Sequence, residues 1–518
     1  MGLRKVAVIG GGPGGLLAAR LLRRRWRCEV TVHERQPAGS TYGFGVAIHD
    51  HALHRLETVD RDAWDVLRDV GYPLRRWTMQ RDGEQVAVEN EGGLGIGRAT
   101  ALARLTELAE RAGVAVRNGR EVCLDDVSSA DLVVAADGVN SATRERLAPS
   151  LGVNLEPVAI PYVWCGAAVD PGGMLLATSE TADGIFTAHV MPFTPGRSTF
   201  QVDTQPEALE RSGMAASSRA TPAAETDEPS ISYLEAAFAD LLVGRRLEAN
   251  RSRWSTFTTV VCNRWSNGRT VLLGDAAHTA HYTVGSGTRM ALEDAIALAA
   301  ALDGGGSLAD SFAAYERARR PAVERLQRRA RRSQRWWGSL PRRFRLPLPT
   351  LLLSYFTRTG SVSLADLTAF NRDLLETCLR LYGRPADRLD VSGAVLASPF
   401  RLNGRRLPAR LIGRGDTDDR QVRVAYLSAS EVEAWTPPAL TLCARAAASV
   451  RGGAEIVCLT GPDARDHLLD RLDLAEQVRA EAGCPVAVEI SEQHRDDAAI
   501  GLLAGRIDLV VMTAGDGS

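Results

Sequence analysis

Three glycines near the start of the chain have the spacing of a dinucleotide-binding turn. The β-branched run from Val6 to Ile9 leads into Gly10-Gly-Gly-Pro-Gly-Gly15, and an apolar helical pattern follows. In a GxGxxG turn the glycines allow a tight bend, close approach of the backbone to a pyrophosphate and close packing of helix on strand. The helix start adds free N–H groups and the positive end of a dipole. We therefore expect cofactor phosphates to contact Gly10, Gly12, Pro13, Gly14 and Gly15.

A carboxylate follows the second expected strand, at the distance that a dinucleotide site requires. The run Glu29-Val-Thr-Val-His33 ends in Glu34, and Arg35 comes next. An acid in this place hydrogen-bonds the ribose hydroxyls and disfavours a 2′-phosphate. The pattern predicts an adenine dinucleotide site that includes Glu34 and Arg35. A glycine-rich turn followed by an incidental acid is the alternative.

Two later strands also end in an aspartate. The apolar run 132–136, which follows Asp131, closes with Asp137-Gly138, and the run 270–273 closes with Gly274-Asp275 before a second glycine-rich turn. An aspartate at a strand end is placed to accept hydrogen bonds from ribityl hydroxyls. A glycine-rich turn that opens a helix directs N–H groups at the pyrimidine end of a flavin, which gains negative charge on reduction. The turn residues expected there are Gly285, Ser286, Gly287 and Thr288.

In this order and spacing, the three motifs resemble the FAD-binding set of the p-hydroxybenzoate hydroxylase-like flavoprotein monooxygenases. Within that family the runs 41–46, 95–98 and 278–288 are similar to the aryl-CoA hydroxylases, typified by salicylyl-CoA 5-hydroxylase and 2-aminobenzoyl-CoA monooxygenase/reductase. The similarity extends from the N-terminus to about Thr368. The resemblance implies that Arg98 contacts the ribityl–pyrophosphate region. It also implies that His281 and Tyr282 line the isoalloxazine side of the pocket.

The resemblance implies an enzyme in which the cofactor carries the oxidation chemistry. NAD(P)H reduces FAD, O₂ adds at flavin C4a, and the resulting hydroperoxide transfers a hydroxyl group to an electron-rich aromatic ring. A single GxGxxG turn is present, so we expect the nicotinamide to bind transiently rather than in a second Rossmann domain. The expected substrate is a small aromatic acid tethered to CoA or a carrier protein, a free aromatic acid, or an aromatic specialised metabolite.

The protein groups that assist the reaction are less sharply indicated. Histidine titrates near neutral pH and can orient a substrate or hold a proton. We name His281, Tyr282 and His189 as candidate catalytic residues, while a purely structural role is the alternative for each histidine. Four further polar residues lie close together in the sequence: His49, Asp50, His51 and His54. One or two of them could contact the substrate. The alternative is that they form the solvated start of a helix.

Two other functional classes stay open on sequence grounds. The same scaffold supports other flavin-dependent oxidations, such as epoxidation or oxidative decarboxylation. Halogenation is disfavoured because the WxWxIP signature is absent. The second class is a non-catalytic flavoprotein whose C-terminal part supplies a binding or oligomer interface. Turnover of NAD(P)H in air with aromatic compounds separates these classes.

Arginines crowd the segment from Arg317 to Arg345, with few acids between them. One interpretation is the solvated face of a helix. The other is a surface for a phosphate-bearing substrate handle, because arginine binds phosphate in a bidentate fashion.

The expected fold is α/β: a Rossmann-like FAD-binding domain with an inserted mixed β-sheet substrate domain, a helical segment and a small C-terminal α/β domain. We expect the FAD-binding domain at 1–70, 98–155 and 262–310, the substrate domain at 71–97 and 156–261, and the helical segment at 311–392. Residues 205–230 are expected to form a loop. Residues 395–518 are similar to the first and last parts of an old yellow enzyme barrel. The segment is too short for a full barrel of about 250 residues, so it is expected to be a remnant without FMN; an unrelated α/β domain is the alternative.

Composition limits the remaining functional classes. The chain has 518 residues and a formal net charge of −1, so no global field attracts nucleic acid or an anionic membrane. The eight cysteines show neither disulfide nor metal-ligand spacing, and we expect no metal site. No apolar run reaches the roughly 20 residues needed to span a bilayer. We expect a cytoplasmic protein and allow for a homodimer.

Overall fold

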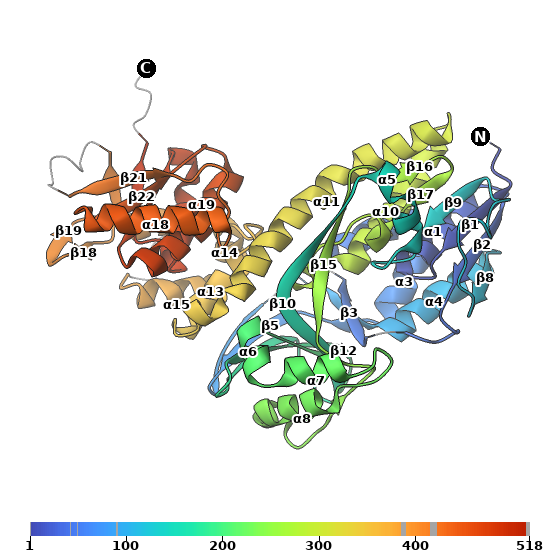
Figure 1. Cartoon of the computed structure of the whole chain (residues 1–518), viewed down its shortest axis with the longest axis horizontal. Helices are drawn as coiled ribbons and strands as arrows, with labels where there is room; N and C mark the ends of the chain where they lie inside the picture. Colours follow the sequence, from blue (N-terminus) through green and yellow to red (C-terminus); the bar gives the residue numbers. More distant parts are fainter. Residues whose placement is uncertain are drawn as a thin grey trace. The chain divides into compact units, whose positions relative to one another are not determined.

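The chain folds as two units, residues 1–334 and 335–518, and the division falls within the long helix α11 (Leu308–Gly338). The computed structural model describes residues 2–41, 43–48, 50–89, 92–384, 390–414 and 422–513 (Figure 1). Each unit is built around parallel strands, as expected for an α/β chain. The finer division of the chain into domains stays a prediction.

A mainly parallel sheet forms the first part of unit 1. Its strand order is β16-β17-β9-β1-β2-β8, and only the β16–β17 pair is antiparallel. The buried apolar runs of β1 and β9 fit a sheet that is covered on both faces. The strands are β1 (Lys5–Ile9), β2 (Glu29–Glu34), β8 (Ala115–Asn118), β9 (Leu132–Ala135), β16 (Ser266–Asn267) and β17 (Thr270–Leu272).

Helices and a small three-stranded sheet accompany the Rossmann-like sheet. Helix α1 packs against both α4 and α10. The helices are α1 (Pro13–Arg25), α2 (Asp50–Val59), α3 (Arg61–Asp69), α4 (Arg98–Arg111), α5 (Ala142–Leu151) and α10 (Gly287–Asp303), with short 3₁₀ turns η1 (Gly274–Ala276) and η2 (Tyr282–Val284). The small sheet has the order β3-β7-β4 and consists of β3 (Gly45–Ile48), β4 (Tyr72–Pro73) and β7 (Leu94–Gly97).

The second large sheet of unit 1 is mixed. Its order is β14-β10-β13-β12-β11-β5-β6, with β15 also paired to β10. β5 and β11 are parallel, whereas the other pairs are antiparallel. The strands are β5 (Arg76–Arg81), β6 (Glu84–Glu89), β10 (Val153–Ala167), β11 (Met174–Glu180), β12 (Ile185–Thr194), β13 (Arg197–Thr204), β14 (Leu247–Glu248) and β15 (Ser255–Cys262).

The expectation of a loop at 205–230 is wrong. This segment contains α6 (Pro206–Arg211), α7 (Met214–Ala220) and the start of α8 (Glu228–Ala237), which is followed by α9 (Ala239–Leu242). Leu209 and Met214 are buried in one cluster with Val163, Phe200 and Val202 of the mixed sheet. The helices form because that face of the sheet is apolar and must be covered, and this outweighs the local Ser, Thr and Pro content.

Unit 2 contains a parallel sheet with the order β20-β24-β23-β22-β21, so its first strand pairs with its last. Helices α18, α19 and α20 connect the four later strands. The elements are α12 (Leu340–Arg343), α13 (Leu348–Thr357), α14 (Leu364–Phe370), α15 (Arg372–Leu381), α16 (Val391–Leu396), β18 (Phe400–Leu402), β19 (Arg405–Leu407), β20 (Leu411–Gly413), β21 (Val424–Ser428), α18 (Pro437–Arg451), β22 (Ile456–Thr460), α19 (Arg465–Ala482), β23 (Val486–Ile490), 3₁₀ turn η3 (Glu492–His494), α20 (Arg495–Leu503) and β24 (Leu509–Met512).

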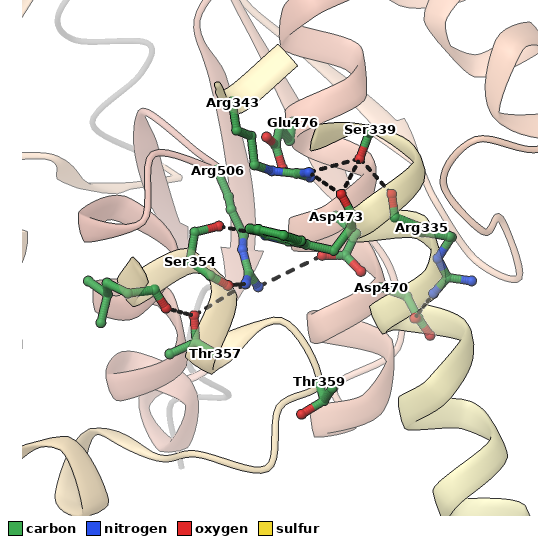
Figure 2. A network of polar contacts seen from close by, with 12 residues as sticks. Arg335, Ser339, Arg343, Ser354, Thr357, Thr359, Asp470, Asp473, Glu476 and Arg506 are labelled. Carbon is green, nitrogen blue, oxygen red and sulfur yellow. Dashed lines mark hydrogen bonds and ion pairs between the residues drawn. The ribbon is translucent and has the colours of Figure 1, made fainter. Parts of the chain in front are cut away.

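Buried ion pairs hold the helical part of unit 2 against α19. Figure 2 shows Arg343, which donates to Glu476 at 2.5 Å and to the Ser339 hydroxyl at 2.8 Å. Arg506 donates to the Ser354 carbonyl and to the Thr357 hydroxyl, both at 3.2 Å. These charges are almost fully buried, so each of them depends on its partners for solvation.

Neighbouring ion pairs between α12 and α19 provide a matched test of this dependence. Glu476→Ala leaves the buried Arg343 without its carboxylate and should lower the free energy of unfolding by about 3 kcal/mol. Glu481→Ala removes the partner of Arg342 from a half-exposed pair and should cost less than about 1 kcal/mol. Urea unfolding followed by circular dichroism measures both; equal losses would contradict the assignment.

Candidate functional site

Gly10 in the first turn and Gly15 at the start of α1 have no room for a side chain. Gly10 has φ +107°, and a Cβ there would lie 2.1 Å from the Ala136 carbonyl oxygen. A Cβ on Gly15 would lie 2.2 Å from the carbonyl oxygen of Gly10. These two glycines therefore let the turn and the start of α1 lie against β1 and β9.

Gly12 differs from its neighbours because it faces open space. It is the N-cap of α1, and a Cβ there would meet no atom of the described residues within 4 Å. No side chain among those residues caps this helix start. The free N–H groups and the positive helix end suit a pyrophosphate, so the turn fits a bound dinucleotide. Pro13 is the first residue of α1.

Glu34 is held at the edge of this turn. Its Oε2 accepts from the Gly11 N–H at 2.7 Å, and its Oε1 accepts from the Gln36 N–H at 2.8 Å. The carboxylate thus lies at the end of β2 beside the glycine turn, as a ribose-binding group requires. The Arg35 side chain is about half exposed and lies 3.9 Å from Glu121.

The Asp137-Gly138 turn mainly positions α5. Asp137 accepts from the Ser141 hydroxyl at 2.6 Å and from the Thr143 N–H at 3.1 Å, and Gly138 has φ +81°. Arg144 on α5 donates to the carbonyls of Asp275 and Ala276 at 3.3 and 3.2 Å. The two aspartate-containing turns are therefore tied together by Arg144, a positioning role that its place on a basic helix did not indicate.

Asp275 lies in a strongly charged environment. Burial raises the pKa of its carboxyl, while the nearby charges of His278, Arg98 and Arg144 act in the opposite direction. Arg98, the first residue of α4, donates its backbone N–H to the Phe44 carbonyl at 2.7 Å. Arg98 and Asp275 thus lie near one another, although they are far apart in sequence.

The turn before α10 is the one that the sequence predicts to hold the flavin head. Gly285 has φ +60°, and Ser286 is the N-cap of α10, whose first residues are Gly287 and Thr288. A Cβ on Gly287 would lie 4.0 Å from Asp275 Oδ1. The Ser286 hydroxyl is buried and has no hydrogen-bond partner in the described part of the chain. A second open helix start with an unused polar group therefore lies beside Asp275.

Asp294 anchors the turn at Gly274, a role that the sequence analysis did not predict. Its Oδ2 accepts from the Gly274 N–H at 3.1 Å and lies 2.8 Å from His278 Nε2, and its Oδ1 accepts from Arg319 at 2.7 Å. Arg319 also donates to Glu293 at 2.7 Å. The sequence did offer a signal for this network: Glu293 and Asp294 are adjacent acids in the mainly apolar helix α10. Charges on a buried face need partners, so ion pairs could have been predicted there.

Aromatic and polar side chains share one face of the mixed sheet. Opposed positions on β10, β13 and β12 carry Trp164, Gln201 and His189, and the next row carries Tyr162 and Asp203. The opposite face is the apolar one covered by α6–α9. Alternation along the strands explains this division, since successive side chains point to opposite faces.

Tyr282 connects this face with the flavin-head loop. Its ring centroid lies 4.8 Å from that of Tyr162 and 6.3 Å from that of Trp164, and its hydroxyl lies 3.5 Å from Asp203. Burial, followed by the negative charge of Asp203, raises the pKa of Tyr282 well above its usual value. Tyr282 is therefore a neutral hydroxyl at physiological pH.

The two candidate histidines have different environments. His189 Nε2 lies 2.8 Å from Asp203 Oδ2 on the sheet face. His281 is fully buried, shares a 2.9 Å hydrogen bond through Nδ1 with the Thr283 hydroxyl, and stacks on Tyr282 at 4.1 Å. The structure thus brings His189, Tyr282 and His281 into one cluster. Asp203 and Gln201, which the strand pattern did not single out, belong to it.

The other polar groups named from the sequence contribute less to this cluster. His49 and the side chains of Asp50 and His51 lie outside the described residues. His54 is exposed and lies 3.6 Å from Glu57. Many arginines of the basic segment are paired with acids, including Arg319, Arg320, Arg335, Arg342 and Arg343.

Two negative observations apply to the described residues alone. None of their helices is long and apolar enough to cross a membrane. No group of three or more of their His, Cys, Asp or Glu side chains is arranged to hold a metal ion.

Comparison with known proteins identifies relatives along the whole chain. Residues 66–330 match the family model described as an FAD binding domain, and residues 8–70 match an NAD(P)-binding Rossmann-like domain. Salicyloyl-CoA 5-hydroxylase of a Streptomyces species is 35% identical, covering 98% of this chain and 99% of that protein. The 3-hydroxy-4-methyl-anthranilyl-[aryl-carrier protein] 5-monooxygenase of Streptosporangium sibiricum is 38% identical, covering 70% and 96%.

Solved structures share the fold. The tetrameric form of 2-methyl-3-hydroxypyridine-5-carboxylic acid oxygenase superposes with a TM-score of 0.53 at 19% identity, covering 72% of this chain and 97% of that one. The crystal structure of PqsL of Pseudomonas aeruginosa has a TM-score of 0.51 at 21% identity, covering 66% and 98%.

Gly12 and Gly10 allow the cofactor-binding role of the first turn to be separated from its folding role. Gly12→Ala places a methyl group in open space, so the apoprotein should keep its unfolding midpoint while its affinity for FAD falls at least about tenfold through overpacking against the ligand. Gly10→Ala must displace the backbone at Ala136 and should destabilise the apoprotein itself. FAD titration and thermal unfolding separate the two. An unchanged FAD affinity in Gly12→Ala would show that FAD does not bind against this turn.

Asp294 should make stability depend on acid pH. Burial acts to raise the pKa of Asp294, but His278 and Arg319 outweigh it and the pKa is lowered. The carboxylate therefore stabilises the fold above the unfolded-state pKa of about 4, and this contribution is lost as the pH falls through the lower folded-state value.

Asp294→Asn should lose about 3 kcal/mol near neutral pH, and its difference from the wild type should shrink below about pH 4. Urea unfolding can be followed by the total tryptophan fluorescence, to which Trp265, 4.8 Å from His278, contributes. A difference that stays constant down to pH 3 would be inconsistent with this assignment.

Proposed function

Because the chain belongs to the FAD-binding monooxygenase family, we propose that it hydroxylates an aromatic acid held as a thioester. It is an FAD-dependent aromatic monooxygenase that uses NAD(P)H and O₂. The reaction consumes NAD(P)H, a proton and O₂, and yields the hydroxylated ring, NAD(P)⁺ and water. When bound, FAD supplies the activation of oxygen and its transfer to the ring.

The observation that carries the proposal is the cluster formed by Tyr282, His189 and Asp203 beside the Gly285–Thr288 loop. The open starts of α1 and α10 would provide donors for the pyrophosphate and for the flavin ring of the cofactor. The aromatic rings of Tyr162, Trp164 and Tyr282 provide a surface for a flat substrate.

We propose that the Asp203 carboxylate holds the proton of a ring hydroxyl or amino group, and that His189 is oriented by its 2.8 Å contact with Asp203. Withdrawal of that proton makes the ring more electron-rich, which favours hydroxylation. Tyr282 and the buried His281 exclude water from the ring's position. His281 has its Nδ1 engaged with Thr283, which favours a positioning role over direct proton transfer.

A thioester handle is supported by relatives of two kinds. One is named for a CoA substrate and matches 98% of the chain, and the other is named for an aryl-carrier protein and matches 70%. The full-length match favours CoA. Arg317 and Arg325, exposed on α11, remain candidates to contact its phosphates.

The parallel sheet of unit 2 supports the proposal of a shortened old yellow enzyme barrel. In a closed eight-stranded barrel the first strand pairs with the last, and here β20 pairs with β24 while β21 to β24 follow in chain order. The hairpin β18–β19 precedes the first strand. We propose that this unit serves packing or homodimer formation rather than FMN chemistry.

A cytoplasmic location also remains a proposal. It is supported by eight free cysteines, seven of them buried, because reducing compartments keep such thiols reduced.

The direct test measures NAD(P)H oxidation in air together with oxygenated product, using aryl-CoA thioesters, carrier-bound aryl groups and free acids. The proposal requires coupled product from a thioester. NAD(P)H oxidation that yields only hydrogen peroxide with every aromatic compound would overturn it.

Asp203→Asn should lower kcat by at least about 100-fold, because a positioned proton acceptor contributes about 10²–10⁴-fold. The variant should also lose the rise of kcat with pH if proton withdrawal is the role of Asp203. Asp183→Asn is the matched control, since Asp183 accepts from Tyr233 of α8 at 2.7 Å and lies outside the site. A pH profile of Asp203→Asn parallel to that of the wild type would refute the proton-holding role.

A further inference from the structure

Two buried N–H groups belong to directly opposed residues on the site face of the mixed sheet. Trp164 on β10 is directly opposite Gln201 on β13, and Gln201 is directly opposite His189 on β12. Trp164 Nε1 and Gln201 Nε2 are buried and have no hydrogen-bond partner among the described residues. The Gln201 amide lies close to the Tyr282 hydroxyl and acts to lower the pKa of Tyr282, against the larger effects of burial and Asp203.

The chemistry of these groups defines what would satisfy them. An indole Nε1–H can only donate, and an amide Nε2 also donates. Buried polar groups in folded proteins are nearly always paired, so two adjacent donors indicate a ligand atom that accepts two hydrogen bonds. A carbonyl oxygen has two lone pairs and meets this requirement.

Gly43, just before β3, lies close to the Trp164 donor. It has φ +81°, and a Cβ at this position would lie 3.9 Å from Trp164 Nε1, in van der Waals contact. A residue with a side chain would be strained in this backbone conformation. Glycine at position 43 therefore adds no side chain next to the indole N–H.

The neighbouring charge indicates that the acceptor is neutral. Asp203 lies two residues beyond Gln201 on the same face of β13 and is almost fully buried. A carboxylate ligand next to it would bring two negative charges together in a poorly solvated site, whereas a carbonyl oxygen avoids that repulsion. The two donors are themselves uncharged, so they select a dipole over an anion.

We propose that Trp164 Nε1 and Gln201 Nε2 donate hydrogen bonds to the acyl carbonyl oxygen of the aromatic substrate and thereby select a neutral thioester over the free acid. This inference rests on the proposed function, because it assigns the residues of the same site that bind the acyl group of the substrate. The ring's hydroxyl or amino group then faces the His189–Asp203 pair, while the carbonyl faces the two N–H groups. The substrate class is an aromatic thioester with a hydroxyl or amino group on its ring.

Ligand binding to the flavin-loaded enzyme tests the proposal without turnover. The probes are 2-hydroxybenzoyl-CoA, the 2-hydroxybenzyl-CoA thioether, which lacks the carbonyl, and 2-hydroxybenzoate. Dissociation constants come from the perturbation of flavin absorbance. Trp164→Phe and Gln201→Leu each remove one donor and keep a side chain of similar size, so the fold does not depend on one variant alone.

Each variant should weaken binding of the thioester by about 3- to 10-fold, the usual effect of one hydrogen bond, and should leave binding of the thioether unchanged. The wild type should bind the thioester more tightly than the free acid. Trp254→Phe is the matched control: Trp254 lies in the apolar cluster on the opposite face of the sheet, where its Nε1–H donates to the Ser230 hydroxyl at 3.2 Å, so loss of this indole donor should alter binding of neither CoA probe.

The outcomes distinguish this inference from the proposed function. If the wild type converts an aryl thioester to an oxygenated product but the variants weaken both CoA probes equally, the donors do not read the carbonyl and the inference is wrong. A parallel fall in FAD affinity would assign the donors to the cofactor and would also overturn it. Failure of the wild type to hydroxylate any aryl thioester refutes the proposed function, whatever the binding data show.

Discussion

The close approach of helices α1 and α10 is the constraint on which the site depends. A Cβ on Gly14 would lie 2.6 Å from Leu273 and 2.9 Å from Ala291, so the two helices meet where neither can carry a larger side chain. Their contact fixes the start of α1 relative to the start of α10. The two sets of free N–H groups, one at Gly12 and one at Ser286, are thereby held in the fixed relation that the proposed FAD site requires.

Charge pairing at a distance keeps this arrangement in place. Asp294 joins the turn at Gly274 to Arg319 of α11, and Arg144 joins the Asp137 turn to the carbonyls near Asp275. None of these contacts uses the Ser286 hydroxyl, which is buried and has no hydrogen-bond partner in the described part of the chain.

The mixed sheet performs two tasks through its two faces. One face is apolar and is covered by α6 to α9, which contributes to stability. The other carries Trp164, Gln201 and Asp203, whose polar atoms are buried at a considerable cost in solvation. A sheet that needed only to be stable would carry apolar residues there, so the polar face is best explained by a ligand.

Several features were predictable because they depend on local geometry. The spacing of Gly10, Gly12 and Gly15 indicates a strand–turn–helix, and Gly-Asp at a strand end marks a turn wherever it lies in the chain. The family resemblance and the α/β class were confirmed by the comparisons. The roles of individual site residues stay predictions.

Other features were not predictable because they depend on long-range pairing. Asp203 and His189 meet only because β12 and β13 pair in one register, and no local pattern specifies that register. The helices in 205–230 form because a distant sheet face must be covered, which outweighs the local preference for turns. Likewise, the basic run of α11 suggests an exposed face, yet Arg319 is buried against acids 25 and 26 residues earlier.

The central claim is that one cofactor pocket, formed by the starts of α1 and α10, serves the whole chain. The flavins released from the purified protein on denaturation test it most directly, when they are separated by chromatography and quantified against protein. The account predicts FAD at one per chain and no FMN. Release of FMN, or of no flavin even after the protein has been incubated with FAD, would contradict it.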